Sequence, residues 1–183
     1  MKHFKTEICF EGEHLVFKRK YFKTKEGKKL FWEYIERRNQ YGHPIIIFAL
    51  TKEKEVILEK IYRFPFEDYV LELPAGLQDK EGESEIEVAE RELLEETGYR
   101  ARKLIKIFQG PMDPGQSTEE GIYYFAKDVV FEKKPAHEDA EDIKVIKIPV
   151  SKLVDFVEKL SKKMKVDSKI LSILSILQKK NLI

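Results

Sequence analysis

Residues 73–99 read LPAGLQDKEGESEIEVAERELLEETGY, and they carry the clearest structural signal in the 183-residue chain. Ser84 and Glu87 have the spacing of a capping box, in which each side chain satisfies a backbone N–H group at the start of a helix. Gly98 supplies the left-handed residue that commonly ends a helix. The sequence therefore predicts a helix over residues 85–97.

The predicted helix carries acidic residues along the edge of its apolar stripe. At 100° per residue, the positions that face the core are Ile86, Ala89, Leu93 and Thr97. Glu92 and Glu96 lie one turn apart beside this stripe, and Glu95 lies further round on the same side. Like charges at this spacing cost a helix roughly 0.2–0.5 kcal/mol per pair. The cluster becomes favourable when hard divalent cations lie between the carboxylates. The alternative is a solvated charged face, which is common in a chain so rich in Lys and Glu.

The residues around the helix favour the metal-site interpretation. The segment resembles the sequence box of the Nudix hydrolases: Gly, a short loop, Glu, seven residues, then Arg-Glu-apolar-x-Glu-Glu-x-Gly-apolar. Gly76 and Glu83 match its start, and residues 91–99, RELLEETGY, fill every later fixed position. One departure is that six residues separate Gly76 from Glu83, where the family usually has five. We expect the extra residue to lie within residues 78–82, where it need not disturb the ligands.

The resemblance to the Nudix hydrolases implies a divalent-metal site. It implies Mg²⁺ as the cofactor, with two or more ions and with Mn²⁺ as a possible substitute. The expected metal ligands are Glu92, Glu96, Glu95 and the carbonyl oxygen of Ala75. Glu83 is expected to be a structural or outer ligand.

The resemblance also implies the catalytic residues. The acidic loop at residues 137–142 would by itself be a solvated surface, but it precedes a predicted strand where the ADP-ribose branch of this family carries its catalytic glutamate. By that resemblance Glu141 is the catalytic base, and Asp139 is the reserve candidate. Glu95 and Arg91 are the other expected catalytic residues, with Arg91 orienting the carboxylates of the box.

Four further segments resemble the branch of the Nudix hydrolases that cleaves ADP-ribose and other ADP-sugars. They are FWEYIER at 31–37, IYR at 61–63, MDPGQS at 112–117 and VDSK at 166–169. The second departs from the branch, since Ile61 replaces a Gln and Phe64 interrupts the usual Arg-Pro. The resemblance implies that Trp32 stacks on adenine and that Arg63 offers a fork suited to phosphate oxygens. By itself Trp32 is more often a core aromatic, and Arg63 an ordinary strand-end arginine. The implied substrate-binding residues are Trp32, Glu33, Arg37 and Arg63.

The implied function is Mg²⁺-dependent hydrolysis of the diphosphate bond of ADP-ribose or a related ADP-sugar, giving AMP and a sugar phosphate. One alternative is a Nudix hydrolase that acts on a GDP-sugar, a dinucleoside polyphosphate or an oxidised nucleotide. A second alternative is a Nudix-fold module that senses a nucleotide without cutting it. Such modules tend to lose the carboxylates of the box, whereas Glu92, Glu95 and Glu96 are all present.

The rest of the chain predicts an α+β fold in two parts. Residues 1–42 are expected to form an N-terminal antiparallel β annex. Residues 43–183 are expected to form the Nudix hydrolase domain, a mixed sheet flanked by helices in an α/β/α sandwich. Strands are predicted at 14–22, 29–37, 45–50, 56–62, 70–73, 103–109, 121–128 and 142–148, and further helices at 151–163 and 167–180. A small sheet with an exposed edge needs a partner. In the ADP-ribose branch that partner is the second subunit, so we expect a homodimer in which the annex contributes to the adenine site.

Composition limits the partners and the compartment. The chain has 34 Lys and Arg residues against 33 Asp and Glu residues, for a net charge of +1. A balanced chain has no overall field to attract nucleic acid or an anionic membrane. Cys9 is the only cysteine, which favours a reducing compartment. The longest apolar stretch, residues 45–50, falls far short of the ~20 residues that span a bilayer. We expect a cytoplasmic protein that binds a nucleoside-diphosphate sugar and neither nucleic acid nor membrane.

Overall fold

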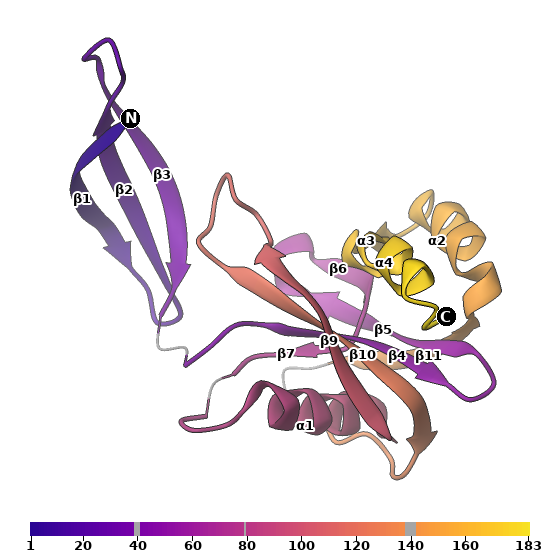
Figure 1. Ribbon diagram of the computed structural model, residues 1–183. Helices are drawn as coiled ribbons and strands as arrows, with labels where there is room; N and C mark the ends of the chain where they lie inside the picture. Colours follow the sequence, from indigo (N-terminus) through magenta and orange to yellow (C-terminus); the bar gives the residue numbers. More distant parts are fainter. Residues whose placement is uncertain (39–40, 79, 138–141) are drawn as a thin grey trace.

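The computed structural model in Figure 1 describes residues 1–38, 41–78, 80–137 and 142–183, whose strands form two sheets. The smaller sheet is antiparallel, in the order β1-β2-β3. Its strands are β1 (Lys2–Glu11), β2 (Leu15–Lys23) and β3 (Lys29–Arg37). The larger sheet contains β4 (Ile45–Thr51), β5 (Glu55–Arg63), β6 (Asp68–Glu72), β7 (Ala75–Gly76), β8 (Tyr99–Arg100), β9 (Lys103–Pro111), β10 (Glu120–Phe131), β11 (Ile143–Pro149) and β12 (Lys165–Val166).

The larger sheet is mixed, as predicted. Its main path runs β12-β6-β5-β4-β10-β8, with β11 paired to β5, β7 to β4, and β9 to β10. The pairs β4–β10 and β6–β12 are parallel. The other pairs of this sheet are antiparallel.

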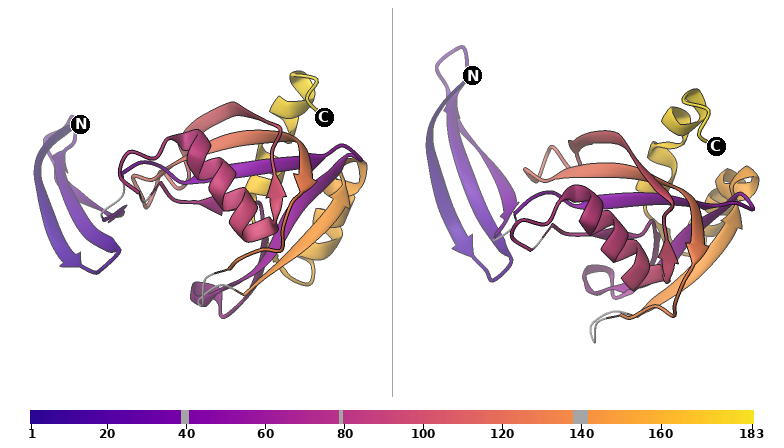
Figure 2. Two further views of the ribbon diagram at one scale, coloured as in Figure 1. Left: turned by 90° about the horizontal axis from the view of Figure 1, so that it is seen from below. Right: turned by 60° about the horizontal axis from the view of Figure 1, so that its bottom comes forward.

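Strand β4 is buried along its whole length because helices cover both faces of the sheet. Successive side chains of a strand point to opposite faces. Ile46, Phe48 and Leu50 therefore join the hydrophobic core beneath the C-terminal helices. The alternate residues Ile45, Ile47 and Ala49 join the core beneath α1 (Glu85–Thr97). Figures 1 and 2 show α1 on one face and α2 (Leu153–Ser161), α3 (Lys169–Ser172) and α4 (Leu174–Lys179) on the other. The predicted α/β/α sandwich is confirmed.

Helix α1 begins and ends where the sequence predicts. The backbone N–H of Ser84 donates to the Glu87 carboxylate at 2.8 Å, and the backbone N–H of Glu87 donates to the Ser84 hydroxyl at 3.3 Å. Gly98 has a φ of 76°, and its N–H donates to the Leu94 carbonyl at 3.0 Å. A Cβ on Gly98 would lie 2.1 Å from the Lys133 carbonyl oxygen, so this position requires glycine for both conformation and space.

The prediction of one continuous helix over residues 167–180 is wrong. The structure has two short helices, because α3 ends at Ser172 and α4 begins at Leu174. The Ser172 hydroxyl donates to the Lys169 carbonyl at 2.9 Å, and such side-chain bonds to the backbone compete with the helical ladder and bend helices. The predicted helix over 151–163 is also shorter, with a 3₁₀ turn at Val150–Lys152 before α2.

The sequence analysis did not delimit β1 and missed three very short strands, β7, β8 and β12. Each of the three has two residues, which is too few for an alternating pattern to identify. They form through pairing with strands far away in the sequence, as β7 does with β4. Among the described residues, every helix falls short of the length and hydropathy that a membrane crossing requires.

The three-stranded sheet stands beside the body of the molecule, as Figures 1 and 2 show, and contacts it through β3. The backbone N–H of Ile35 donates to the Gln116 carbonyl at 2.8 Å. The Ile35 carbonyl in turn accepts from the Thr118 N–H at 3.3 Å. Several large apolar side chains of this sheet are exposed, including Phe4, Ile8, Phe10, Phe31 and Trp32. The loop at residues 112–119 is therefore the point at which the small sheet is attached.

Candidate functional site

A cavity of about 440 Å³ lies where α1 meets β5, β6 and β7. Its lining contains both negatively and positively charged side chains. The acidic side chains of the lining are Glu72, Glu92, Glu95, Glu96 and Glu119. The basic side chains are Arg37, Arg63, Arg91 and Lys169. Five of the predicted site residues on or near α1 line this cavity, namely Ala75, Arg91, Glu92, Glu95 and Glu96.

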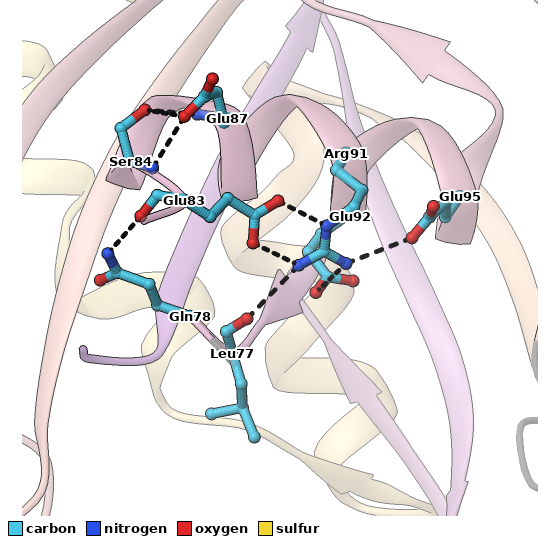
Figure 3. A network of polar contacts seen from close by, with 8 residues as sticks. All are labelled: Leu77, Gln78, Glu83, Ser84, Glu87, Arg91, Glu92 and Glu95. Carbon is cyan, nitrogen blue, oxygen red and sulfur yellow. Dashed lines mark hydrogen bonds and ion pairs between the residues drawn. The ribbon is translucent and has the colours of Figure 1, made fainter. Parts of the chain in front are cut away.

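Arg91 connects the acidic residues of the box, as Figure 3 shows. Its Nε and Nη2 atoms donate to the two oxygens of Glu83 at 2.8 and 3.1 Å. Its Nη1 donates to Glu92 at 2.8 Å and to Glu95 at 3.3 Å. A further bond reaches the Leu77 carbonyl at 3.4 Å. The hydrogen bonds from Arg91 hold the pKa of Glu83 below its usual value. Arg91 thus fixes the loop before α1 and two of the predicted metal ligands.

Strand β7 and the buried end of α1 position the other carboxylates. Glu96 is buried, and its carboxylate accepts the Ala75 N–H at 3.1 Å. A Cβ on Gly76 would lie 1.9 Å from the carboxyl carbon of Glu92, so the Glu92 side chain packs directly against the glycine backbone. Gly76 is therefore needed for the close approach of α1 to β7.

The segment after β10 is tied to the C-terminal end of α1. A ring nitrogen of His137 lies 2.8 Å from the Glu96 carbonyl oxygen, and the Ala136 N–H donates to the Glu95 carbonyl at 2.8 Å. His137, to which the sequence analysis gave no role, thus holds the chain beside the site. Glu141 and Asp139 lie outside the described residues, so their assignment stays a prediction.

Two of the predicted substrate-binding residues line the cavity, and each is paired with a carboxylate. Arg63 donates two bonds to Glu72, at 2.8 and 2.9 Å, and these bonds raise the pKa of Arg63. Arg37 donates to Glu119 at 2.7 Å. The sequence analysis missed both acidic partners. Glu72 lies directly before the Leu-Pro-Ala-Gly segment, and Glu119 lies two residues after the Pro-Gly-x-Ser loop. Their closeness to these two motifs was the signal in the sequence that could have identified them.

The other two predicted substrate-binding residues do not line this cavity. Trp32 is 58% exposed, and its indole N–H donates to the Gly115 carbonyl at 2.7 Å. Glu33 pairs with Arg19 within the small sheet, at 2.7 and 3.1 Å. Within the chain, Trp32 therefore lies on the loop at residues 112–117 rather than in the charged cavity.

The cavity fits a hard divalent cation by the chemistry of its donors. Glu92, Glu95 and Glu96 offer only oxygen ligands, which Mg²⁺ prefers. In the arrangement shown in Figure 3, the Glu92 and Glu95 carboxylates contact Arg91. Among the described residues, no three Asp, Glu, His or Cys side chains are grouped so that they could hold a metal ion together. The fit to a divalent cation therefore rests on the chemistry of these oxygen donors and not on a preformed cluster among the described residues.

Several known proteins are similar to this chain in sequence or in fold. A family model described as NUDIX domain matches residues 41–170. The chain is 34% identical over 125 residues to an ADP-ribose pyrophosphatase of Bacillus subtilis, covering 67% of each protein. It is 32% identical over 138 residues to a GDP-mannose pyrophosphatase of Yersinia pestis, covering 69% of the chain and 67% of that protein. A solved structure described as an ADP compounds hydrolase superposes with a TM-score of 0.81 at 22% identity, covering 98% of the chain and 94% of that structure.

The pairing of Arg91 with Glu83 predicts a pH-dependent loss of stability in Glu83→Gln. Because the pKa of Glu83 is lower in the folded state than its ordinary 4.5, the pair stabilises the protein fully above that value. The stabilisation is lost as the pH falls through the folded pKa. We expect Glu83→Gln to lower the free energy of unfolding by about 1 kcal/mol at neutral pH. The difference from wild type should shrink below pH 4.5.

Denaturant unfolding from pH 3 to pH 7 measures this difference. Glu132→Gln is the matched control, because Glu132 forms a two-bond pair with Arg100 that is far more exposed. Exposed pairs contribute little. A Glu83→Gln deficit that stays constant across the whole pH range would contradict the assigned ion pair.

Proposed function

The chain belongs to the Nudix family and is a Nudix pyrophosphohydrolase, and from this premise we propose that it hydrolyses the diphosphate bond of ADP-ribose or a related ADP-sugar. The products would be AMP and a sugar phosphate. The resemblance of residues 31–37, 61–63, 112–117 and 166–169 to the ADP-sugar branch supports this substrate class. The similarity to the ADP-ribose pyrophosphatase of Bacillus subtilis supports it further.

The observation that carries the proposal is that carboxylates of α1 and basic side chains of other segments line the same cavity. Glu92, Glu95 and Glu96 line one side, while Arg37, Arg63 and Lys169 come from other segments. A substrate with two adjacent phosphate groups needs both features. The basic groups contact its phosphate oxygens, and the carboxylates hold the cations that neutralise the remaining charge.

Glu92, Glu96, Glu95 and the Ala75 carbonyl are the proposed ligands for divalent cations, with Mg²⁺ as the proposed metal. When bound, such ions neutralise phosphate charge and lower the pKa of a bound water. Arg91 supports these ligands, because its guanidinium contacts both Glu92 and Glu95.

The remaining residues act on the substrate and on water. The Arg63 fork, oriented by Glu72, would donate to phosphate oxygens in planar, bidentate geometry. Glu141 is proposed to accept a proton from the attacking water. The oxygen of that water would form a bond to one phosphorus while the bond from that phosphorus to the bridging oxygen breaks. The departing phosphate keeps the bridging oxygen.

We propose that residues 1–42 are a dimerisation annex, that residues 43–183 are the hydrolase domain, and that the protein is a homodimer. The edge strands of a small sheet present unpaired backbone groups that can pair with another chain. Phe4, Phe10 and Phe31 of this sheet are exposed in the single chain, at 48%, 67% and 53%. Contiguous exposed apolar side chains mark interaction sites. A second subunit would cover this surface and bring Trp32 to a shared adenine site.

A second candidate substrate is a GDP-sugar. The similarity to a GDP-mannose pyrophosphatase, at 32% identity, is the observation that favours it. The two candidates differ in the base, and the charged cavity is proposed to bind the phosphates rather than the base. A direct comparison of substrates separates them.

We expect ADP-ribose to be hydrolysed with a higher kcat/KM than GDP-mannose, diadenosine polyphosphates or 8-oxo-dGTP. Chromatography of the products should show AMP and ribose 5-phosphate. EDTA should abolish activity and Mg²⁺ should restore it. Glu96→Gln should lose most of kcat without unfolding, because the amide oxygen can still accept the Ala75 N–H. A preference for GDP-mannose would replace the proposed substrate, and near wild-type turnover in Glu96→Gln would remove Glu96 from the ligands.

Glu141→Gln should slow hydrolysis by about 10²-fold or more, the usual scale for a lost general base. Asp139→Asn is the matched control and should have a much smaller effect. Steady-state kinetics at saturating Mg²⁺ measures both variants. The reverse ranking would transfer the role of base to Asp139, and full activity in both variants would remove this loop from catalysis.

Trp32→Ala should raise the KM for ADP-ribose by roughly 5- to 150-fold, by analogy with the ~1–3 kcal/mol that base stacking contributes in single-stranded nucleic acids. The dependence on Mg²⁺ should not change. Phe131→Ala is the matched control, because Phe131 is 59% exposed, about the same as Trp32 at 58%, and lies at the far end of β10. Light scattering should give twice the mass of the chain. A monomer with normal activity would rule out the shared site, and an unchanged KM would exclude Trp32 from it.

A further inference from the structure

The residue that follows the proposed base in the sequence, Asp142, is held by two strands of the larger sheet. The backbone N–H of Tyr62 on β5 donates to the Asp142 carbonyl at 3.1 Å. The Tyr69 phenol on β6 donates to the Asp142 carboxylate. Directly after Asp142, β11 begins at Ile143, which pairs with Ile61 of β5. The start of β11 is therefore joined to β5 by backbone bonds and to β6 by one side-chain bond.

The end of α1 holds the same segment on its other side. A ring nitrogen of His137 lies 2.8 Å from the Glu96 carbonyl oxygen. Glu141 lies between His137 and Asp142 in the sequence and adjoins Asp142 directly. Consecutive Cα atoms are about 3.8 Å apart across a trans peptide bond. Whatever fixes Asp142 therefore also restricts where the backbone of Glu141 can lie.

The Tyr69 ring is itself held on one face of the β5–β6 hairpin. It lies opposite Tyr62, and the two rings meet edge to face at a centroid distance of 5.6 Å. The ammonium groups of Lys60 and Lys144 lie over the Tyr69 ring, 4.4 and 5.5 Å from its centroid, where cations are attracted to the ring. The hydrogen bond to Asp142 raises the pKa of the Tyr69 phenol, so the phenol stays protonated at neutral pH and remains a donor.

The hairpin presents different residues to the charged cavity and to Asp142. Successive side chains of a strand point to opposite faces. Arg63 and Glu72 of the hairpin line the charged cavity, whereas Tyr62 and Tyr69 are not part of its lining. Tyr69 therefore reaches the reaction only through Asp142, and any effect on catalysis has to pass through the segment that carries the base.

We propose that Tyr69 is a positioning residue for the catalytic base. Through its bond to the Asp142 carboxylate it fixes the backbone beside Glu141, so that the Glu141 carboxylate stays within reach of the proton on the attacking water. The inference rests on the proposed role of Glu141 in the hydrolysis. It does not depend on the sugar or the nucleobase of the substrate, because Glu141 acts on water.

Steady-state kinetics at saturating Mg²⁺ tests this role in Tyr69→Phe and Asp142→Ala. Both changes remove the same side-chain bond, so each should lower kcat by roughly 3- to 10-fold, the effect of losing one hydrogen bond. The KM should stay within about 2-fold of wild type, because neither side chain lines the cavity. Asp142→Asn should recover most of the kcat, since its amide oxygen still accepts from the phenol.

Tyr62→Phe is the matched control. It removes a hydroxyl from the ring that packs against Tyr69, and it keeps the backbone N–H that donates to Asp142. Its kcat and KM should both match those of wild type. Thermal unfolding of every variant identifies any loss of folding. A kcat that falls as far in Tyr62→Phe as in Tyr69→Phe would contradict the proposal, because the effect would then be common to both rings.

A double-mutant cycle with Glu141→Gln separates positioning of the base from general stabilisation. If Tyr69 acts through Glu141, Tyr69→Phe should lower kcat by less than about 2-fold when Glu141→Gln is already present. A loss as large as that in wild type would overturn the proposal. Unchanged kcat in Tyr69→Phe would do the same, whether or not KM rises. Full activity in Glu141→Gln would remove both the base and its positioning residue.

The comparison also distinguishes failure of this inference from failure of the proposed substrate. The variants are measured on ADP-ribose and on GDP-mannose, and the cycle is read on the compound that wild type hydrolyses. If only GDP-mannose is hydrolysed and the cycle shows the expected coupling, the ADP-sugar proposal is wrong and the role of Tyr69 stands. If ADP-ribose is hydrolysed equally fast by wild type and Tyr69→Phe, the role of Tyr69 is wrong and the substrate proposal stands.

Discussion

The geometry of the charged cavity depends on the contacts that the guanidinium group of Arg91 makes. It contacts the carboxylates of Glu83, Glu92 and Glu95 and the carbonyl of Leu77. Carboxylates this close on one side of a helix repel one another unless a positive charge lies among them. Arginine suits this position because its charge does not titrate and its planar fork matches carboxylate oxygens. The loop before α1, the helix and the end of β7 are thereby held in one arrangement.

The buried sheet provides the rigid support for that arrangement. Strand β4 pairs with β7, and the Ile47 N–H donates to the Pro74 carbonyl at 2.9 Å, so the Pro-Ala-Gly turn is fixed to the core. Helix α1 then packs against the glycine of this turn, with Glu92 in direct contact with Gly76. A shift of the turn would move the carboxylates with it. The positions of Glu92 and Glu96 therefore depend on how this turn is held by β4.

The basic side chains of the cavity are held differently. Each one, apart from Arg91, pairs with a single carboxylate. The three pairs are Arg37 with Glu119, Arg63 with Glu72, and Lys169 with Asp167. A carboxylate partner orients a long side chain at a small cost in freedom, and a phosphate group can then share or replace that partner. In the proposed function, such pairs would contact a diphosphate through several separate side chains.

The sequence by itself determined the features that depend on neighbours within one or two turns. The bounds of α1 follow from the Ser84–Glu87 capping box and Gly98, and the spacing of the acidic residues within the helix places them on one side of it. The continuous apolar run at 45–50 likewise predicted a strand, and the structure shows it buried along its whole length. Only the tertiary structure decided the contacts between distant segments. These include the partner of Arg63, the attachment of Trp32 to Gly115 and the bond from Tyr69 to Asp142. Local spacing cannot specify them, because they depend on how whole strands and loops pack and on which polar groups then meet.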